Sequence, residues 1–206
     1  MTLPTQLTVL RIALAVVFFV LFALVEPPMI GWAATVFAVA AATDWWDGHL
    51  ARVMKTTSTL GAFLDPLADK FLTGAALVAF ALKDYVPLWM VVLVIARDVY
   101  MTVLRTAADG VSIHVKTSYL AKVKTFGQMT FIIAVLLLLL LQTGPLGPAV
   151  AQEAHMTLDS GLVVWLMSAI TLLTVASAVV YSYDNWSLLR LITRRYILRR
   201  TGQEAN

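Results

Sequence analysis

Long apolar runs separated by short polar segments make up most of this chain. Six runs follow one another, at about residues 11–25, 29–52, 60–82, 88–108, 119–141 and 161–183. With its polar extensions, each run is near or above the roughly 20 residues that a helix needs to cross a bilayer. The pattern predicts an all-α integral membrane protein with six transmembrane helices, in which residues 1–206 form a single domain.

The second run is the weakest span, because its purely apolar part ends near residue 42 and charged residues follow. We keep it as a span because its charged end can face a cavity rather than lipid. Residues 142–159, with two Gly-Pro pairs, are predicted to be the longest loop.

Both chain termini are expected to carry short interfacial helices. Residues 2–11 form a mixed segment, which we predict to lie along the membrane surface as a helix start. Residues 184–206 space apolar residues at helical intervals between five arginines, which is typical of a helix lying on anionic lipid. A plain positively charged anchor is the alternative for this tail.

Composition agrees with membrane integration. The chain has 206 residues, of which 60% are hydrophobic, and its mean hydropathy is +0.84. Soluble domains are roughly 45–50% apolar. The chain has no cysteine, which excludes disulfides and thiolate metal ligands.

The basic residues predict an orientation. With six spans, both termini and the connections after the second and fourth spans lie on one side, and every Lys and Arg except Lys83 belongs to that side. The long segment 142–159 on the opposite side holds Glu153 and Asp159 and no basic residue. Because basic residues accumulate on the cytoplasmic side, we expect a multi-pass protein of the cell (inner) membrane with both termini and the active site cytoplasmic.

Four aspartates stand close together in this apolar sequence. They are separated by three, eighteen and four residues and are Asp44, Asp47, Asp65 and Asp69. Spacings of three and four place each pair on one face of a helix, and two facing pairs would offer oxygen ligands suited to Mg²⁺ or Mn²⁺. A helix cap or loop charge is an alternative for Asp44 or Asp65 alone, but it does not explain all four.

A second polar group is basic. Arg97 and Arg105 lie in the fourth run, and Lys122 and Lys124 begin the fifth. Together they could form a phosphate pocket, with Arg forks and Lys point charges. The alternative is that the lysines flank the membrane span and that Arg97 pairs with Asp98 or Asp84.

The acidic stretch carries a family signature. It reads Asp44-x-x-Asp47-Gly48-x-x-Ala51-Arg52, then eight residues, then Gly61-x-x-x-Asp65-x-x-x-Asp69. At every defined position it resembles the signature of the CDP-alcohol phosphatidyltransferases. The resemblance implies a homodimeric membrane enzyme with two Mg²⁺ or Mn²⁺ ions on the four aspartates, Asp69 also acting as the base. It further implies that the CDP-diacylglycerol donor lies against Gly48, Ala51 and Arg52.

A finer resemblance concerns the acceptor. Residues 3–130 are similar to the bacterial subgroup that uses glycerol 3-phosphate, including Thr8 and Arg11 near the start and Arg97, Arg105, Lys122 and Lys124 later. This implies transfer of the phosphatidyl group from CDP-diacylglycerol to sn-glycerol 3-phosphate, with release of CMP. In this interpretation Thr8 and Arg11 are candidate donor contacts, and the four basic residues hold the acceptor.

Other functions remain open at this point. Within the family the acceptor could be inositol phosphate, phosphatidylglycerol or serine, although a basic pocket disfavours serine. A six-helix cation transporter would also place acids in the membrane, but it does not account for Gly48 and Arg52. A structural membrane scaffold would leave the four aspartates unexplained.

Overall fold

The described part of the chain is entirely helical. The computed structural model describes residues 3–25, 29–54, 59–109 and 119–186; within its helices, the side chains of residues 3–5, 7, 44–54, 59–69, 107–109 and 119–121 lie outside that description. The helices are α1 (Leu3–Phe19), α2 (Ile30–Met54), α3 (Thr59–Leu82), α4 (Leu88–Asp109), α5 (Tyr119–Gln142), α6 (Pro148–Asp159) and α7 (Leu162–Asp184). This confirms the all-α prediction, and five of the helices follow predicted runs closely.

The two ends of the chain compare differently with their predictions. From residue 3 onward, the interfacial start expected at residues 2–11 belongs to α1, which continues into a π-helical turn, Val20–Leu24, so one helix replaces two elements. The expected interfacial helix in the tail lies outside the described residues from 187 onward.

The prediction of a loop at residues 142–159 was wrong, because α6 occupies most of it. Gly147 has a φ of 102° and Pro148 stands in the first turn of α6, where its missing N–H costs nothing. Residues 149–159 contain neither Gly nor Pro. Gly161, with a φ of 77°, then separates α6 from α7. The Gly-Pro pair therefore marks a helix start rather than a long loop.

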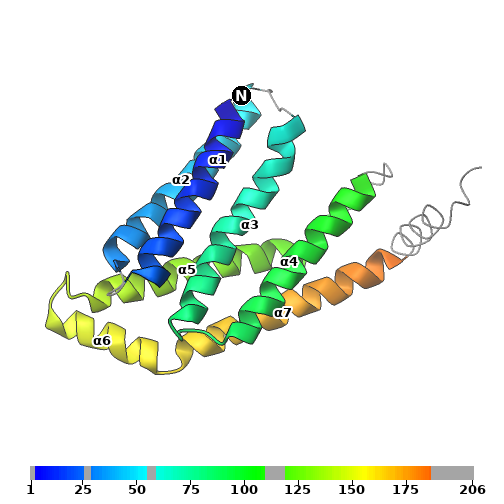
Figure 1. Ribbon diagram of the computed structural model, residues 1–206. Coiled ribbons are helices and arrows are strands. Elements are labelled where there is room, and N and C mark those ends of the chain that lie inside the picture. Colours follow the sequence, from blue (N-terminus) through cyan, green and yellow to red (C-terminus); the bar gives the residue numbers. More distant parts are fainter. Residues whose placement is uncertain (1–2, 26–28, 55–58, 110–118, 187–206) are drawn as a thin grey trace, which may run out of the picture.

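The helices pack as an irregular bundle (Figure 1). α1 packs against α2 and α3, and α4 packs mainly against α7 and α3, while α5 contacts α2, α3, α6 and α7. Figure 1 shows the end of α2 and the starts of α1 and α3 at one end of the molecule, and α6 lying across the opposite end.

An aromatic cluster joins α1, α2 and α3. The ring of Phe18 lies 5.5 Å from that of Phe37, and the ring of Phe22 lies 5.4 Å from that of Phe80. All four side chains are buried. Such pairs stabilise a fold by about 0.5–1.5 kcal/mol each beyond the burial of their area. The cluster fixes α1 against α2 and α3, the two helices that carry the aspartate motif.

The outer surface of the bundle is apolar, as expected for a membrane protein. On α4 and α7, Trp89, Val103, Trp165 and Leu172 are all more than half exposed, and exposed apolar surface of this extent marks contact with lipid or protein. Two described helical stretches, Lys122–Gln142 and Leu162–Asp184, are long and apolar enough to cross a membrane. The count of six spans stays a prediction.

Candidate active site

The aspartate motif lies on α2 and α3. Asp44 and Asp47 belong to the second half of α2, and Asp65 and Asp69 to the first half of α3. Figure 1 shows these two parts at the same end of the molecule. The side chains of residues 44–69 are outside the described part, including those of Gly48, Ala51 and Arg52, so the predicted ligation and donor contacts stay predictions. Among the described side chains, no group of three acidic or histidine residues could hold a metal ion.

Thr8 and Arg11, the candidate donor contacts, are buried on α1. Their spacing of three residues places both on one face of the helix, and each is at most 1% exposed. α1 packs against both helices that carry the motif. Burial of an arginine is costly unless its charge is compensated. The position of Arg11 beside the motif helices is therefore compatible with a role in binding the donor.

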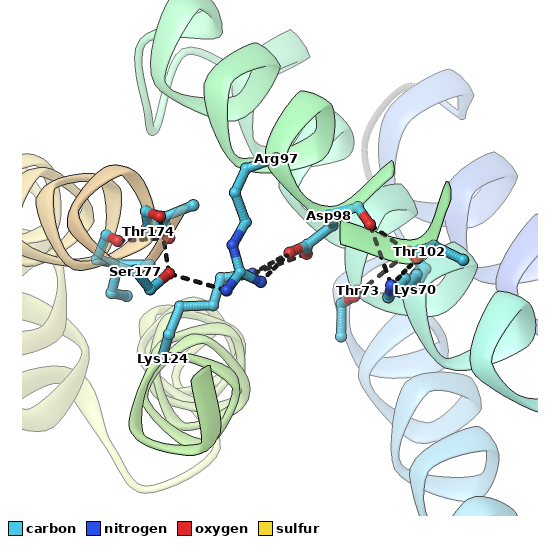
Figure 2. Close-up of polar contacts among 9 residues, drawn as sticks. Lys70, Thr73, Arg97, Asp98, Thr102, Lys124, Thr174 and Ser177 are labelled. Atoms are coloured by element: carbon cyan, nitrogen blue, oxygen red, sulfur yellow. Dashed lines mark hydrogen bonds and ion pairs between the residues drawn. The ribbon is translucent and has the colours of Figure 1, made fainter. Parts of the chain in front are cut away.

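The structure brings Arg97 and Lys124 together through Asp98 (Figure 2). Lys124 Nζ donates to both carboxylate oxygens of Asp98, at 2.8 Å and 2.7 Å. Arg97 Nη1 donates to Asp98 Oδ1 at 3.0 Å. The side chain of Lys124 is 2% exposed, that of Arg97 9% and that of Asp98 14%. The pairing of Arg97 with Asp98, considered above as an alternative to a phosphate contact, is therefore present. We call Arg97, Asp98 and Lys124 the Asp98 cluster.

The other two basic residues lie apart from this cluster. Arg105, two turns further along α4, is half-buried, and Lys122 is exposed. Within the part of the chain that the structure describes, neither forms a hydrogen bond or ion pair with the Asp98 cluster. The four basic residues thus separate into a pair bonded to Asp98 and a peripheral pair.

Other polar residues, which sequence reasoning did not assign to the site, anchor the cluster to its neighbours. Arg97 Nη2 donates to Ser177 Oγ of α7 at 2.8 Å. Lys70 Nζ donates to the backbone oxygen of Asp98 at 3.1 Å and also to Thr102 Oγ1. Thr102 Oγ1 in turn donates to the same backbone oxygen of Asp98 at 2.8 Å. Figure 2 shows α3, α5 and α7 converging on this turn of α4.

Two sequence signals could have indicated these residues. Asp98 is an acid in the middle of an apolar helix, and such residues are usually functional. The buried polar residues Thr171, Thr174 and Ser177 recur every three residues on α7, which marks one polar stripe facing the bundle interior.

Among the described side chains, the charges of the Asp98 cluster do not balance. Two cations, the buried Lys124 and the largely buried Arg97, share one carboxylate. Arg97 Nε is also buried and has no hydrogen-bond partner among the described residues. A buried donor without a partner and an uncompensated positive charge are both costly. Both costs disappear when an anion binds to the guanidinium, so the cluster is suited to receive one.

A groove of about 900 Å³ between α1, α3 and α4 reaches Asp98, the one member of the cluster among its lining residues. Its walls are mostly apolar, and its polar lining includes Lys70, Asp98, Thr102 and Gln128. Pockets of this size and character accommodate small molecules whose polar groups meet a few fixed partners. The groove gives the exposed edge of Asp98 a connection to the surface.

Comparison with known proteins agrees with the motif. The sequence model of the CDP-alcohol phosphatidyltransferases matches residues 1–180. The chain is 36% identical over 149 residues to a Bacillus subtilis (strain 168) protein, covering 66% of this chain and 76% of the relative. It is 42% identical over 142 residues to one from Pectobacterium atrosepticum, covering 65% and 76%, and 40% identical over 144 residues to one from Yersinia enterocolitica, covering 66% and 77%.

All three relatives bear the name CDP-diacylglycerol–glycerol-3-phosphate 3-phosphatidyltransferase. The family match covers the aspartate motif and the Asp98 cluster alike. This chain therefore belongs to the CDP-alcohol phosphatidyltransferase family.

Proposed function

We propose that this protein transfers the phosphatidyl group of CDP-diacylglycerol to sn-glycerol 3-phosphate, giving phosphatidylglycerophosphate and CMP. The names of its relatives support this reaction. The observation that carries the choice of acceptor is the unbalanced positive charge of the Asp98 cluster, with the unpartnered Nε of Arg97. An anion would compensate the charge and accept a hydrogen bond from Nε, and glycerol 3-phosphate carries a phosphate dianion.

Arg97 and Lys124 are the acceptor contacts that the geometry supports best. The guanidinium of Arg97 donates hydrogen bonds to Asp98 and Ser177 and keeps Nε and further N–H groups for phosphate oxygens. The ammonium of Lys124 has three donors, of which two point to Asp98. In this proposal Arg105 and Lys122 add peripheral contacts or attract the anion over a longer range.

The donor is held at the aspartate motif in this proposal. Gly48, Ala51 and Arg52 lie against its CDP moiety, Arg52 next to the pyrophosphate, while Thr8 and Arg11 support it from α1. The four aspartates are oxygen donors on two helices at one end of the molecule, a donor set that fits Mg²⁺ or Mn²⁺. Divalent ions bound there supply charge neutralisation for the phosphoryl oxygens, and members of this family generally depend on them.

The chemical step is an in-line displacement at phosphorus. A hydroxyl oxygen of glycerol 3-phosphate forms a bond to the phosphorus that carries the diacylglycerol. The bond from that phosphorus to the bridging oxygen of CMP breaks, and CMP leaves with the electron pair. Asp69 takes the hydroxyl proton as general base. Arg97 and Lys124 hold the acceptor's own phosphate, so that its hydroxyl stays aligned with the bond that breaks.

The membrane setting belongs to the same proposal. The apolar outer surface and the two long apolar stretches are compatible with a membrane enzyme. We propose six spans in the cell (inner) membrane, with the active site and both termini cytoplasmic, and a homodimeric assembly.

The direct test is an acceptor panel. The purified full-length protein in detergent would receive CDP-diacylglycerol with radiolabelled glycerol 3-phosphate, inositol phosphate, phosphatidylglycerol or serine, with and without Mg²⁺ or Mn²⁺. We expect metal-dependent formation of phosphatidylglycerophosphate and little product with serine, which has no phosphate. Preferential turnover of any other acceptor would refute the proposed acceptor.

A further inference from the structure

Asp98 connects more elements than any other polar residue drawn in Figure 2. Its carboxylate holds Lys124 of α5 and its neighbour Arg97, and Arg97 reaches Ser177 of α7. Its backbone oxygen accepts a hydrogen bond from Lys70 of α3. Lys70 directly follows Asp69, the proposed base. One turn of α4 therefore links the motif helix α3 with α5 and α7, which carry Lys124 and Ser177 of the proposed acceptor pocket around Arg97.

We infer that Asp98 is a positioning residue for the acceptor: it holds the Arg97 guanidinium and the Lys124 ammonium in the arrangement that receives the phosphate of glycerol 3-phosphate. Ser177 holds the far side of the same guanidinium. This inference rests on the proposed function, since it assigns a role within that acceptor site.

The reason is the cost of keeping two cations side by side without a carboxylate. Lys124 is buried and Arg97 largely so, and the two cations repel each other across the position that Asp98 occupies. Without the carboxylate, each would be an uncompensated buried charge. Their long side chains would then turn away toward water and lose the shared geometry. Hydrogen-bond donors that are already in position bind an anion more tightly than donors that must be ordered on binding.

Three possible roles of Asp98 predict different effects of its removal on acceptor binding. If the carboxylate merely competed with the substrate phosphate for the two cations, its removal would tighten acceptor binding. If it only joined helices, its removal would lower the stability of the fold and leave the affinity of the folded enzyme unchanged. Positioning predicts weaker acceptor binding with unchanged donor binding.

The experiment compares Asp98→Asn, Asp98→Glu and Ser177→Ala with the wild-type protein in detergent. Asp84→Asn is the matched control, because it makes the same change at an exposed turn between α3 and α4, at a positive φ that Asn accepts. The KM for each substrate is measured together with kcat, which is calculated per mole of folded enzyme. The increase in melting temperature caused by glycerol 3-phosphate alone gives a binding measurement independent of turnover.

We expect Asp98→Asn to raise the KM for glycerol 3-phosphate about ten- to a hundredfold, the loss typical of charge-assisted contacts. The KM for CDP-diacylglycerol should stay within about twofold, and the stabilisation by glycerol 3-phosphate should be lost. Asp98→Glu should recover most of the affinity. Ser177→Ala keeps the helix intact and should raise the same KM by about three- to tenfold, which keeps the inference testable if Asp98→Asn does not fold.

An unchanged or lower KM for glycerol 3-phosphate in both Asp98→Asn and Ser177→Ala would overturn the inference. So would an equal rise in the KM for both substrates. Failure of the proposed function is distinguishable, because the wild-type protein itself would then neither use glycerol 3-phosphate nor be stabilised by it.

Discussion

The contrast between Lys124 and Lys122 gives the sharpest test of the described structure. The two lysines lie two residues apart on α5, but Lys124 is buried and bonded to Asp98, whereas Lys122 is exposed. Replacement of either by Met keeps most of the aliphatic stem and removes only the ammonium group. Any difference between the two variants then reports the ion pair rather than the charge count or the volume.

The magnitude follows from the contacts. Removing one partner of a buried ion pair costs about 3–5 kcal/mol. Asp98 would keep Arg97 Nη1 on Oδ1 at 3.0 Å, so no lone charge remains and the cost falls at the lower end, about 3 kcal/mol, for the lost charge-assisted hydrogen bonds. For a chain of this length, that corresponds to a fall in melting temperature of about 6–12 °C. Lys122→Met should change it by no more than about 2 °C.

The assay is thermal unfolding of the purified protein in one detergent, followed by tryptophan fluorescence and by loss of the monodisperse peak. A double variant, Lys124→Met with Asp98→Asn, should lose less than the sum of the two single variants, because neither partner then remains as a lone buried charge. Equal melting temperatures for Lys124→Met and Lys122→Met would refute the buried ion pair. Strict additivity in the double variant would show that the two side chains do not interact.

Three further predictions concern the aspartate motif and the topology. Asp44→Asn, Asp47→Asn and Asp65→Asn should each abolish turnover while leaving the protein folded and inserted, because the metal loses a ligand; full activity of the wild-type protein in excess EDTA would contradict this. Asp69→Asn should lower kcat by about a hundredfold or more while donor binding, measured with radiolabelled CDP-diacylglycerol, is retained in part; loss of donor binding with normal kcat would contradict its role as base. A cysteine at Gln152, exposed on α6, should react with an impermeant maleimide on intact cells, whereas one at Ser58 should not, and the opposite labelling would reverse the orientation.

The helices were predictable because apolar length is a local signal. The run predicted at residues 88–108 became Leu88–Asp109, and that at 119–141 became Tyr119–Gln142. The miss at α6 has a local cause as well. Pro148 and the glycines around it were interpreted as loop residues, although Pro in the first turn and Gly beyond the last are also the residues that bound a helix.

The candidate site was predictable only in part. That Arg97 and Lys124 form a basic group followed from the sequence, but the contact of Lys124 with Asp98 joins residues 26 positions apart and depends on how α4 and α5 each pack against α3 and α7. Which lysine is buried could not be predicted either. α5 is apolar around most of its circumference, so no polar face indicated whether Lys122 or Lys124 points inward.

The aromatic cluster has a consequence for the order in which the enzyme is assembled during synthesis. Its members Phe18, Phe22, Phe37 and Phe80 all precede residue 83, so α1, α2 and α3 can lock together before α4 leaves the ribosome. The helices that carry the four aspartates are then in place while the acceptor pocket is still missing. That pocket is finished last, since the anchor of Arg97 on α7 is Ser177, 80 residues further along the chain. A nascent chain released before α7 would keep the two helices of the aspartate motif and lack the fixed guanidinium that we propose receives the acceptor.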